Sequence, residues 1–273
     1  MKIHAFAATV AVATALVACS GNRASDSGGT TTDPGTVAST GAATVLGNFT
    51  ASRVAYDPAT DQMIIESIPF DDDVFSGRYD RDTTLDRGAY RAYVSTNGFD
   101  RYIAYFDESA SGAVSGGVVG SDRYLDHGYR GAVYSRSGNV TLPSTTQRAY
   151  YNGDYVGLRT NAEGGPMETV IGDAEMEVDF SDDTVRGAIL NRVVVFSTDP
   201  TVATTPIRNS ITFADSSLNR TNGTFEGGIA TPDVDGSYEG MIADGTGSAT
   251  EIVGITEIVE GNFSENGTFI AIQ

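Results

Sequence analysis

The clearest pattern in the sequence is an alternation of apolar and polar residues in the second half of the chain. In the segment 173–180 every second residue is apolar, namely Ala174, Met176, Val178 and Phe180, and the residues between them are acidic. A period of two is typical of a β-strand that turns one face to a core and the other to water. The turn residues 181–183 and a strand-like segment at 184–189 complete a predicted hairpin.

The same pattern continues to residue 273 and predicts a β-barrel. Most connections between its strands are short, apart from 159–171 and 193–206. Sequential antiparallel strands close most simply as an eight-stranded up-and-down barrel, which leaves no open sheet edge. The interior of such a barrel is filled by side chains or holds one small ligand. The expected strands are 149–158, 172–180, 184–192, 207–214, 222–230, 236–243, 249–258 and 267–272.

Glycine is unusually frequent. It accounts for 32 of 273 residues, nearly 12%, whereas it accounts for about 7% of the residues of an average protein. A glycine inside a strand leaves space above it, so a large aromatic ring can lie across it and a narrow barrel can coil sharply. We therefore expect the strand glycines to be packing positions. They alternate with aromatic residues in Tyr151-x-Gly153-x-Tyr155-x-Gly157, Gly223-x-Phe225-x-Gly227 and Gly236-x-Tyr238-x-Gly240.

The segment 45–148 is less regular and predicts a smaller β-rich subdomain, which we call the handle. Short strand-like pieces, such as 63–65 and 102–106, alternate with acidic turns. A short helix would also fit 110–119, although its glycines argue against a long one. The predicted fold class is mainly β, with an eight-stranded antiparallel barrel at 149–273 preceded by the handle.

The N-terminus has the features of a lipoprotein signal. Lys2 is followed by thirteen apolar or small residues at 5–17, a length typical of a signal peptide and too short for a membrane-spanning helix. The run ends in Leu16-Val-Ala-Cys19-Ser, which resembles the lipobox of bacterial lipoproteins. An ordinary secretory peptide is the alternative, but the one cysteine of the chain falls where a lipobox requires it. We expect residues 1–18 to be removed and Cys19 to be the lipid attachment site.

Several acyl chains on one residue anchor a protein stably to a membrane. Ser20, directly after the cysteine, resembles the signal that directs lipoproteins to the outer membrane. Residues 19–44 are poor in large apolar side chains and are expected to form a flexible tether. The predicted location is the cell outer membrane, with the folded part exposed at the surface; the periplasmic face stays open as an alternative.

Charge and composition exclude several partners. There are 36 acidic and 17 basic residues, giving a formal net charge of −19. A chain this acidic is not expected to bind nucleic acid electrostatically. The basic residues are sixteen arginines and Lys2, so the mature chain would contain no lysine. Its partners should offer basic or Arg-compatible polar surfaces. A single cysteine also excludes an internal disulfide and a cysteine-based zinc site.

The barrel motifs resemble those of the transferrin-binding protein B family. Besides the glycine and aromatic motifs above, they include Gly172-Asp-Ala-x-Met176-x-Val-Asp179-Phe180 and Glu251-Ile-Val-Gly254-Ile255. The resemblance covers 149–273 and implies a surface lipoprotein with a handle and an eight-stranded barrel in each lobe. The chain has the length of one lobe, and the family's closing strand appears only as Gly267-Thr-Phe269-Ile-Ala271. The resemblance therefore implies the fold and the location but not transferrin as the ligand.

Catalytic and metal-binding patterns are weak. After signal removal the only histidine is His127, which has no G-x-S-x-G or S-x-x-K nucleophile motif with it, so a turn beside Gly128 is the preferred interpretation. The clusters 71–73 and 233–239 hold carboxylates that could bind calcium, but Asp235-Gly is also an ordinary hairpin turn.

A pair of carboxylates for glycoside hydrolysis could be drawn from Glu175, Glu177 and Asp179. These side chains share the predicted solvent face of one strand, where nothing raises the pKa of a general acid. The sequence therefore predicts no cofactor, no metal and no enzyme activity.

The segment 78–102 is the strongest candidate for partner binding because arginine and tyrosine interleave there. These two residue types dominate protein-binding hot spots. The alternative is that the tyrosines pack the handle while the arginines neutralise neighbouring aspartates. The candidate partner-binding residues are Arg78, Tyr79, Arg81, Arg87, Tyr90, Arg91, Arg101 and Tyr102.

Together these features predict a non-catalytic, outer-membrane-anchored surface lipoprotein that binds a protein or a small molecule. Two alternatives stay open. The barrel could span the membrane or bind a ligand in the periplasm, because lipid-out and core-in alternation look alike in sequence. The chain could also be an enzyme with an unrecognised site, or a barrel that binds an oligosaccharide or haem.

Overall fold

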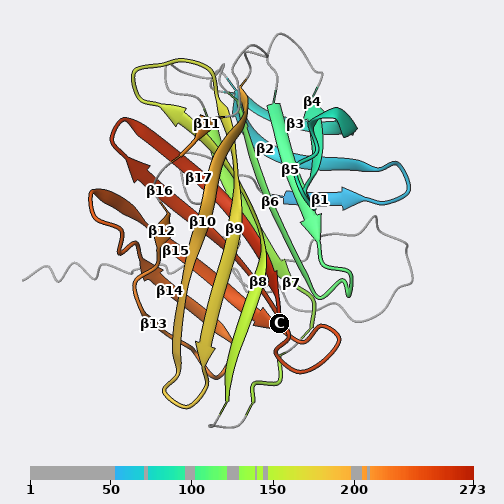
Figure 1. Cartoon of the computed structure of the whole chain (residues 1–273). Coiled ribbons are helices and arrows are strands. Elements are labelled where there is room, and N and C mark those ends of the chain that lie inside the picture. Colours follow the sequence, from blue (N-terminus) through green and yellow to red (C-terminus); the bar gives the residue numbers. More distant parts are fainter. Residues whose placement is uncertain are drawn as a thin grey trace, which may run out of the picture. The chain divides into compact units, whose positions relative to one another are not determined.

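The structure is a computed structural model that describes residues 53–70, 73–95, 102–121, 129–138, 140–143, 147–197, 205–207 and 210–273. The predicted signal segment, Cys19, the tether, Arg101 and His127 lie outside these residues, as do Asp71 and Asp72. Within the described residues the regular elements are β-strands and one 3₁₀ turn, η1 (Thr83–Leu85) (Figure 1). No helix in them has the length and apolar character to cross a membrane.

Seven strands form the first sheet, and each pairs antiparallel with the next along the chain. The helix considered for 110–119 is wrong, because 114–121 is a strand whose side chains are all buried. Its glycines fit this strand closely: a Cβ atom on Gly117 would lie 3.0 Å from the carbonyl oxygen of Tyr105. The strands of this sheet are β1 (Arg53–Asp57), β2 (Gln62–Phe70), β3 (Asp73–Arg81), β4 (Arg91–Ser95), β5 (Tyr102–Glu108), β6 (Val114–Ser121) and β7 (Tyr129–Arg136).

The second sheet forms the barrel, and its long strands are also antiparallel neighbours. Their order is β10, β9, β8, β17, β16, β15 and β14, so the first long strand along the chain pairs with the last. The bounds are β8 (Arg148–Asn161), β9 (Glu168–Asp179), β10 (Thr184–Ser197), β14 (Thr224–Gly228), β15 (Val234–Ala243), β16 (Glu251–Glu260) and β17 (Phe263–Ile272).

An eighth, irregular strand at 211–218 closes the ring between β10 and β14. It pairs with β10 through the short pieces β12 (Ile211–Thr212) and β13 (Ser216–Ser217). On its other side Phe213 forms a bridge with Ile229, and the Ala230 amide donates a hydrogen bond to the Thr212 carbonyl. A further short strand, β11 (Thr205–Pro206), pairs with β10 near its end. The predicted mainly β fold, with an eight-stranded barrel after a β-rich handle, is confirmed.

Several barrel strands are longer than the sequence pattern predicted. The expected connection 159–171 is shorter, because β8 reaches Asn161 and β9 begins at Glu168. The expected connection 193–206 is also shorter, because β10 continues to Ser197. Irregularities in the β9–β10 register interrupt the period of two after Leu190 and after Val194, which hides the strand's continuation in the sequence.

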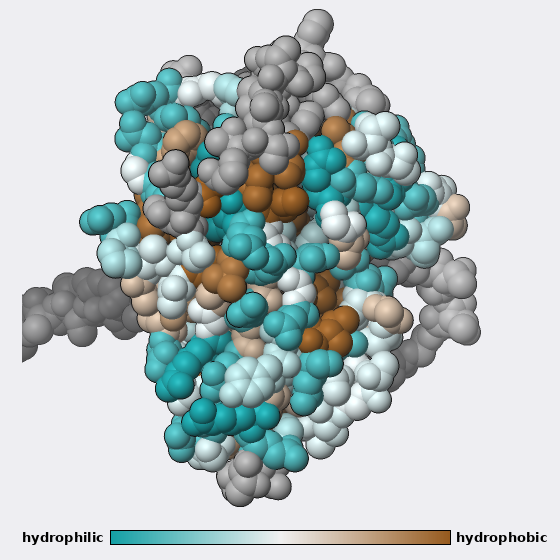
Figure 2. All heavy atoms as spheres, in the orientation of Figure 1, coloured by the Kyte–Doolittle hydropathy of each residue, from teal (hydrophilic) through white to brown (hydrophobic). Residues whose placement is uncertain are grey.

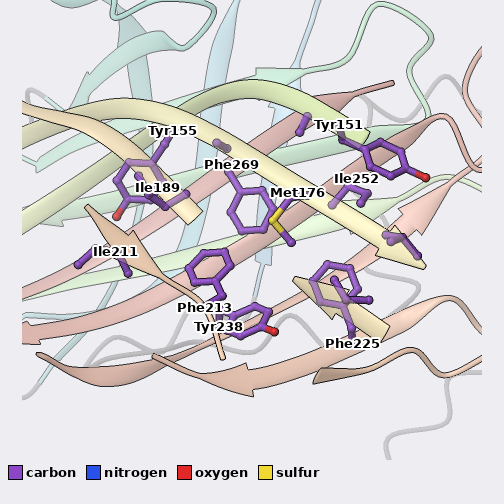
Figure 3. Close-up of a cluster of buried hydrophobic side chains, with 14 of the residues drawn as sticks. Tyr151, Tyr155, Met176, Ile189, Ile211, Phe213, Phe225, Tyr238, Ile252 and Phe269 are labelled. Atoms are coloured by element: carbon purple, nitrogen blue, oxygen red, sulfur yellow. The ribbon is translucent and has the colours of Figure 1, made fainter. Parts of the chain in front are cut away.

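The interior of the barrel is filled by its own apolar and aromatic side chains. All of the labelled side chains in Figure 3 are buried, and rings from several strands meet in the middle. Phe213 and Tyr238 stack with their ring centroids 4.2 Å apart. The labelled residues are Tyr151, Tyr155, Met176, Ile189, Ile211, Phe213, Phe225, Tyr238, Ile252 and Phe269.

The strand glycines are packing positions, as the sequence predicts. Tyr238 lies across Gly227, where a Cβ atom would be 2.6 Å from the ring, and Phe225 lies across Gly240 at the same distance. In both cases ring and glycine are directly opposite each other on β14 and β15. The rings therefore cover glycines on the neighbouring strand.

The handle packs on the outer face of the barrel through a second buried cluster. Strands β6 and β7 contact β16 and β17. The cluster combines handle residues such as Tyr105 and Val118 with barrel residues such as Leu158, Val253 and Ile270. We call this contact the seam.

Hydrogen bonds across the seam fix the two parts to each other. Arg136 of β7 donates to the carbonyl oxygens of Asn222 and Ile242 at 2.8 and 2.6 Å. Ser111 Oγ donates to the buried Glu251 carboxylate at 2.6 Å. These bonds join handle side chains to residues of the barrel that are distant in sequence. They therefore fix the position of the handle on the barrel.

Candidate binding site

Three of the predicted binding residues are inside the protein. Tyr79, Tyr90 and Tyr102 expose 0, 1 and 2% of their surfaces. Tyr79 and Tyr102 belong to a cluster within the handle, and Tyr90 belongs to the seam. Burial raises the pKa of Tyr79 and Tyr90 well above that of a free tyrosine. These tyrosines pack the handle, as the alternative interpretation of the segment held, and they present no surface to a partner.

Arg91 lies on a stack of aromatic rings. Its guanidinium carbon is 4.5 Å from the ring centroid of Tyr56 and 5.5 Å from that of Phe106. The two rings are themselves stacked at 5.4 Å, and Arg91 Nη1 donates a hydrogen bond to Tyr56 Oη at 2.9 Å. Such a stack holds the cation in place while leaving the remaining guanidinium donors directed away from the rings.

Asp61 connects this stack to a second arginine. Its carboxylate accepts hydrogen bonds from the hydroxyl groups of Tyr56 and Tyr93 at 3.1 and 3.0 Å. Arg81 Nε lies 3.6 Å from the same carboxylate. We call Tyr56, Asp61, Arg81, Arg91 and Tyr93 the handle network.

Arg81 is held firmly by Asp86. Its two terminal nitrogens donate to the two carboxylate oxygens of Asp86 at 2.5 and 2.6 Å, a bidentate pair. Burial alone would raise the pKa of the Asp86 carboxyl, but the Arg81 hydrogen bonds and the Ala92 amide outweigh it and hold that pKa below its usual range. The handle network is therefore a preformed array of charged and aromatic groups.

Arg78 is the most accessible of the predicted arginines in the described residues, with 57% of its side chain exposed. It donates to Gln62 Oε1 at 3.0 Å and lies 3.6 Å from the Asp57 carboxylate. A long exposed arginine with one weak ion pair can move to a partner's carboxylate or carbonyl at little cost.

Arg87 lies apart from the handle network, in a hollow at the seam. The hollow has a volume of about 110 Å³. The Arg87 guanidinium donates a hydrogen bond to the Asp86 carbonyl oxygen at 2.7 Å. The lining residues are Arg87, Gly88, Asp154, Tyr155, Ile171, Gly172, Asp173 and Asn191.

Two carboxylates face each other in this hollow. Asp154 and Asp173 are directly opposite on β8 and β9. The Ala89 amide donates to Asp154 at 3.2 Å, and Asn191 Nδ2 donates to Asp173 at 2.6 Å. Burial, together with the nearby Asp154 carboxylate, raises the pKa of Asp107 to about 6. The hollow is thus lined by two carboxylates and the Arg87 guanidinium, which give it a net negative charge.

The carboxylates considered for hydrolysis do not form an acid pair. Glu175 is exposed, whereas Asp179 is buried, so the prediction that all three share a wet face is wrong for Asp179. Ser181 donates hydrogen bonds to Asp179, which lower its pKa, and Arg148 forms an ion pair with it at 2.7 Å. A lowered pKa is the opposite of what a general acid needs.

Among the described residues, no group of three or more His, Cys, Asp or Glu side chains is placed to hold a metal ion. Asp233 has a φ of 62°, which is the left-handed conformation of a tight turn before β15. The turn falls at 231–233, whereas Asp235 and Gly236 lie inside β15 opposite Val259 and Ile258, so the interpretation of Asp235-Gly as the hairpin turn is wrong.

Sequence reasoning missed a buried ion pair inside the barrel. Arg192 and Glu265 expose 2 and 1% of their surfaces, and Arg192 Nη2 donates to Glu265 at 2.6 Å. Tyr155 Oη donates to the same carboxylate, also at 2.6 Å. The signal was hidden because Asn191, with a φ of 51°, lies in the register irregularity of β10 and changes which residues point inward.

Figure 2 shows that polar residues predominate on the visible face and that apolar residues occur in small separate groups. In the described residues the large hydrophobic side chains that are exposed are Tyr150, Val259 and Ile272. Contacts on this surface would therefore depend on polar and charged groups.

The solved structures that this chain resembles include transferrin-binding protein B. The intact Ap-TbpB, with its N and C lobes, is 13% identical with a TM-score of 0.47, over 83% of this chain and 44% of that one. A double mutant of the vaccine antigen transferrin binding protein B from Haemophilus parasuis Hp5 is 12% identical with a TM-score of 0.49, over 84% and 43%. A surface lipoprotein is 15% identical with a TM-score of 0.36, over 59% and 75%.

These are structures of the family that the barrel motifs resemble. This chain spans less than half the length of the two transferrin-binding protein B structures. No protein-family model and no curated protein matches the sequence.

Proposed function

We propose that this chain is a non-catalytic binding protein, anchored in the outer membrane through lipidated Cys19, whose handle and barrel bind a protein ligand at the cell surface. The anchoring part rests on the lipobox-like residues 16–20 and the tether that follows. The binding part rests on the folded residues.

The observation that carries the proposal is the filled barrel. Aromatic side chains from the strands and from 211–218 occupy its interior, as Figure 3 shows. This packing disfavours the oligosaccharide- or haem-binding alternative, in which a small ligand would occupy the interior. A partner has to use the outer surface, where the handle offers arginines beside aromatic rings.

The direction of the apolar side chains disfavours a membrane-spanning barrel. In this barrel the apolar side chains of Ala174, Met176 and Val178 face the interior. The outward-facing residues include Glu175, Arg186 and Glu226. A spanning barrel has the reverse arrangement, with an apolar band outside.

A protein ligand with basic patches fits the charge. The chain carries 36 acidic against 17 basic residues, and the hollow lined by Asp154 and Asp173 has a net negative charge. The similar structures are of proteins named for transferrin binding. Because this chain spans less than half of those proteins, we do not carry transferrin over as its ligand.

The anchoring is tested by labelling cells with palmitate and treating intact cells with protease. We expect label on the wild-type protein and none on Cys19→Ser, and we expect protease to remove the folded part. Label on Cys19→Ser would disprove the lipid site, and complete protection of the folded part would disprove surface exposure.

The binding surface is tested with two matched variants. Arg78 and Arg186 are both exposed and each pairs with one aspartate, but Arg78 is on the handle and Arg186 is on β10. A protein captured by the full-length chain should bind Arg78→Ala at least several-fold more weakly and Arg186→Ala as tightly as the wild type. Equal binding by both variants would exclude this part of the handle as the contact surface.

A further inference from the structure

A buried arginine at the seam lacks a counter-ion among the described residues. Arg130 of β7 exposes 7% of its surface. Its Nη1 donates to Thr160 Oγ1 at 2.6 Å, which is the hydrogen bond that its guanidinium makes within the described part of the chain. Its Nε is buried without a partner there. Leaving a buried charged group without ionic compensation is costly.

A buried amide lies nearby with neither of its polar atoms paired. Asn266 of β17 is fully buried, with an exposed fraction of 0%. Within the described residues, neither Asn266 Oδ1 nor Asn266 Nδ2 has a hydrogen-bond partner. Buried side-chain amides in native proteins are almost always paired with protein or with a bound species.

The strand register brings the two groups together. Thr160 is opposite Ser264, and Asn266 lies two residues further along the same strand, on the same face. On the other side of β17, Glu257 is opposite Asn266. Arg130, which bonds to Thr160 and feels the charge of Glu257, therefore reaches across β17 beside Asn266.

The electrostatic surroundings leave this cation undercompensated. Burial lowers the pKa of Arg130, and Coulombic attraction to Glu257 and Glu265 opposes that effect without outweighing it. Glu265 is already bound by Arg192 and Tyr155 inside the barrel. A water molecule would satisfy hydrogen bonds here but not the charge.

We propose that a small monatomic anion of the size of chloride binds at the seam, between Arg130 Nε and Asn266 Nδ2. The two groups supply N–H donors from opposite parts of the protein, one from the handle and one from the barrel. The burial of both groups favours a single-atom anion over a larger carboxylate or phosphate. The anion would fasten the handle to the barrel.

Bromide gives a direct test, because it substitutes for chloride and scatters X-rays anomalously. Crystals of the protein grown in bromide should show an anomalous peak within hydrogen-bond distance of Arg130 and Asn266. Water or empty space at that position in bromide-grown crystals would overturn the proposal.

Thermal unfolding provides the test in solution. At constant ionic strength, replacing gluconate by chloride should raise the unfolding midpoint of the wild type, by about 5–10 °C at a halide concentration 100 times the dissociation constant. The Asn266→Asp variant places a carboxylate beside Arg130 and should unfold at the same temperature in both salts. The control Asn152→Leu changes an exposed amide on β8 and should keep the wild-type halide response. A wild type that unfolds at the same temperature in both salts would contradict the anion site.

Discussion

The ring of Tyr238 lies directly across Gly227 on the neighbouring strand, so a Cβ atom at that glycine would be 2.6 Å from the ring. The ring cannot withdraw easily, because Phe213 stacks on it and its hydroxyl donates to the Ala214 carbonyl at 2.7 Å. We therefore expect Gly227→Ala to lower the free energy of unfolding by about 1–3 kcal/mol, the usual cost of overpacking a core. Urea unfolding measures the loss.

The next residue provides the control for this prediction. A Cβ atom on Gly228 would meet only the Gly236 carbonyl oxygen, at 3.8 Å. Gly228→Ala should therefore change the free energy of unfolding by less than about 1 kcal/mol. Equal losses for the two variants would mean that the ring does not determine the need for glycine.

The buried pair of Arg192 and Glu265 should be sensitive to loss of one partner. Glu265→Gln removes the carboxylate that Arg192 Nη2 contacts at 2.6 Å and leaves the cation buried. We expect a loss of about 3–5 kcal/mol in the free energy of unfolding. The exposed pair of Arg186 and Asp215 is the comparison, and Asp215→Asn should cost less than about 1 kcal/mol. Similar costs at both sites would contradict the importance of burial.

Asp107 should make the protein less stable as the pH rises. Its folded pKa of about 6 lies above the unfolded value of 3.8, so the folded state holds the proton more tightly. The contribution of protonated Asp107 to the free energy of unfolding is fully present below about pH 4. It is lost as the pH rises towards 6. Asp107→Asn carries no charge and should remove this loss, so it should be more stable than the wild type by about 1–3 kcal/mol at pH 7.5.

The measurement for Asp107 is urea unfolding of both proteins at pH 4, 5, 6 and 7.5. The difference between the variant and the wild type should grow between pH 4 and 6 and stay constant above that. A difference that is independent of pH would show that the Asp107 carboxyl titrates normally in the folded protein.

Arg136 should hold the handle to the barrel. Replacing it by methionine keeps the length of the side chain but leaves the carbonyl oxygens of Asn222 and Ile242 without its donors. We expect a loss of about 1.5–3 kcal/mol and faster amide exchange in β7 and at the start of β14. Arg186→Met, at an exposed position on β10, is the control. Unchanged exchange in Arg136→Met would mean that the apolar cluster alone holds the seam.

The barrel was predictable because one of its faces is wet. Strand β9 alternates between buried Ala174, Met176 and Val178 and more exposed acidic positions, so its period of two is visible in the sequence. Repeating this pattern predicts seven of the strands and their order, whereas the strand expected at 207–214 has its pairs with β10 at 211–212 and 216–217. The ends of β10 did not follow, because a residue with left-handed conformation, Asn191, interrupts the alternation.

The candidate site was less predictable, because the handle sheet is covered on both faces. Tyr102 and Ile103 are adjacent in β5 and are both buried, one in the handle cluster and one in the seam. Without a wet face there is no alternation to separate packing tyrosines from accessible ones. Arg81 and Arg91 are close along the chain, but the roles of Tyr56 and Asp61 depend on contacts between distant strands that no local pattern indicates.

The irregular strand 211–218 is a weakly attached part of the barrel wall. The other neighbouring strands are joined by long ladders, whereas this segment is held to β10 by two short pairs at β12 and β13. Breaking those few bonds, together with the contacts to β14, would open the ring along one line while leaving the rest of the sheet intact. Transient opening should therefore start there, and a protease or a deuterium-exchange experiment should detect this segment before any other part of the barrel.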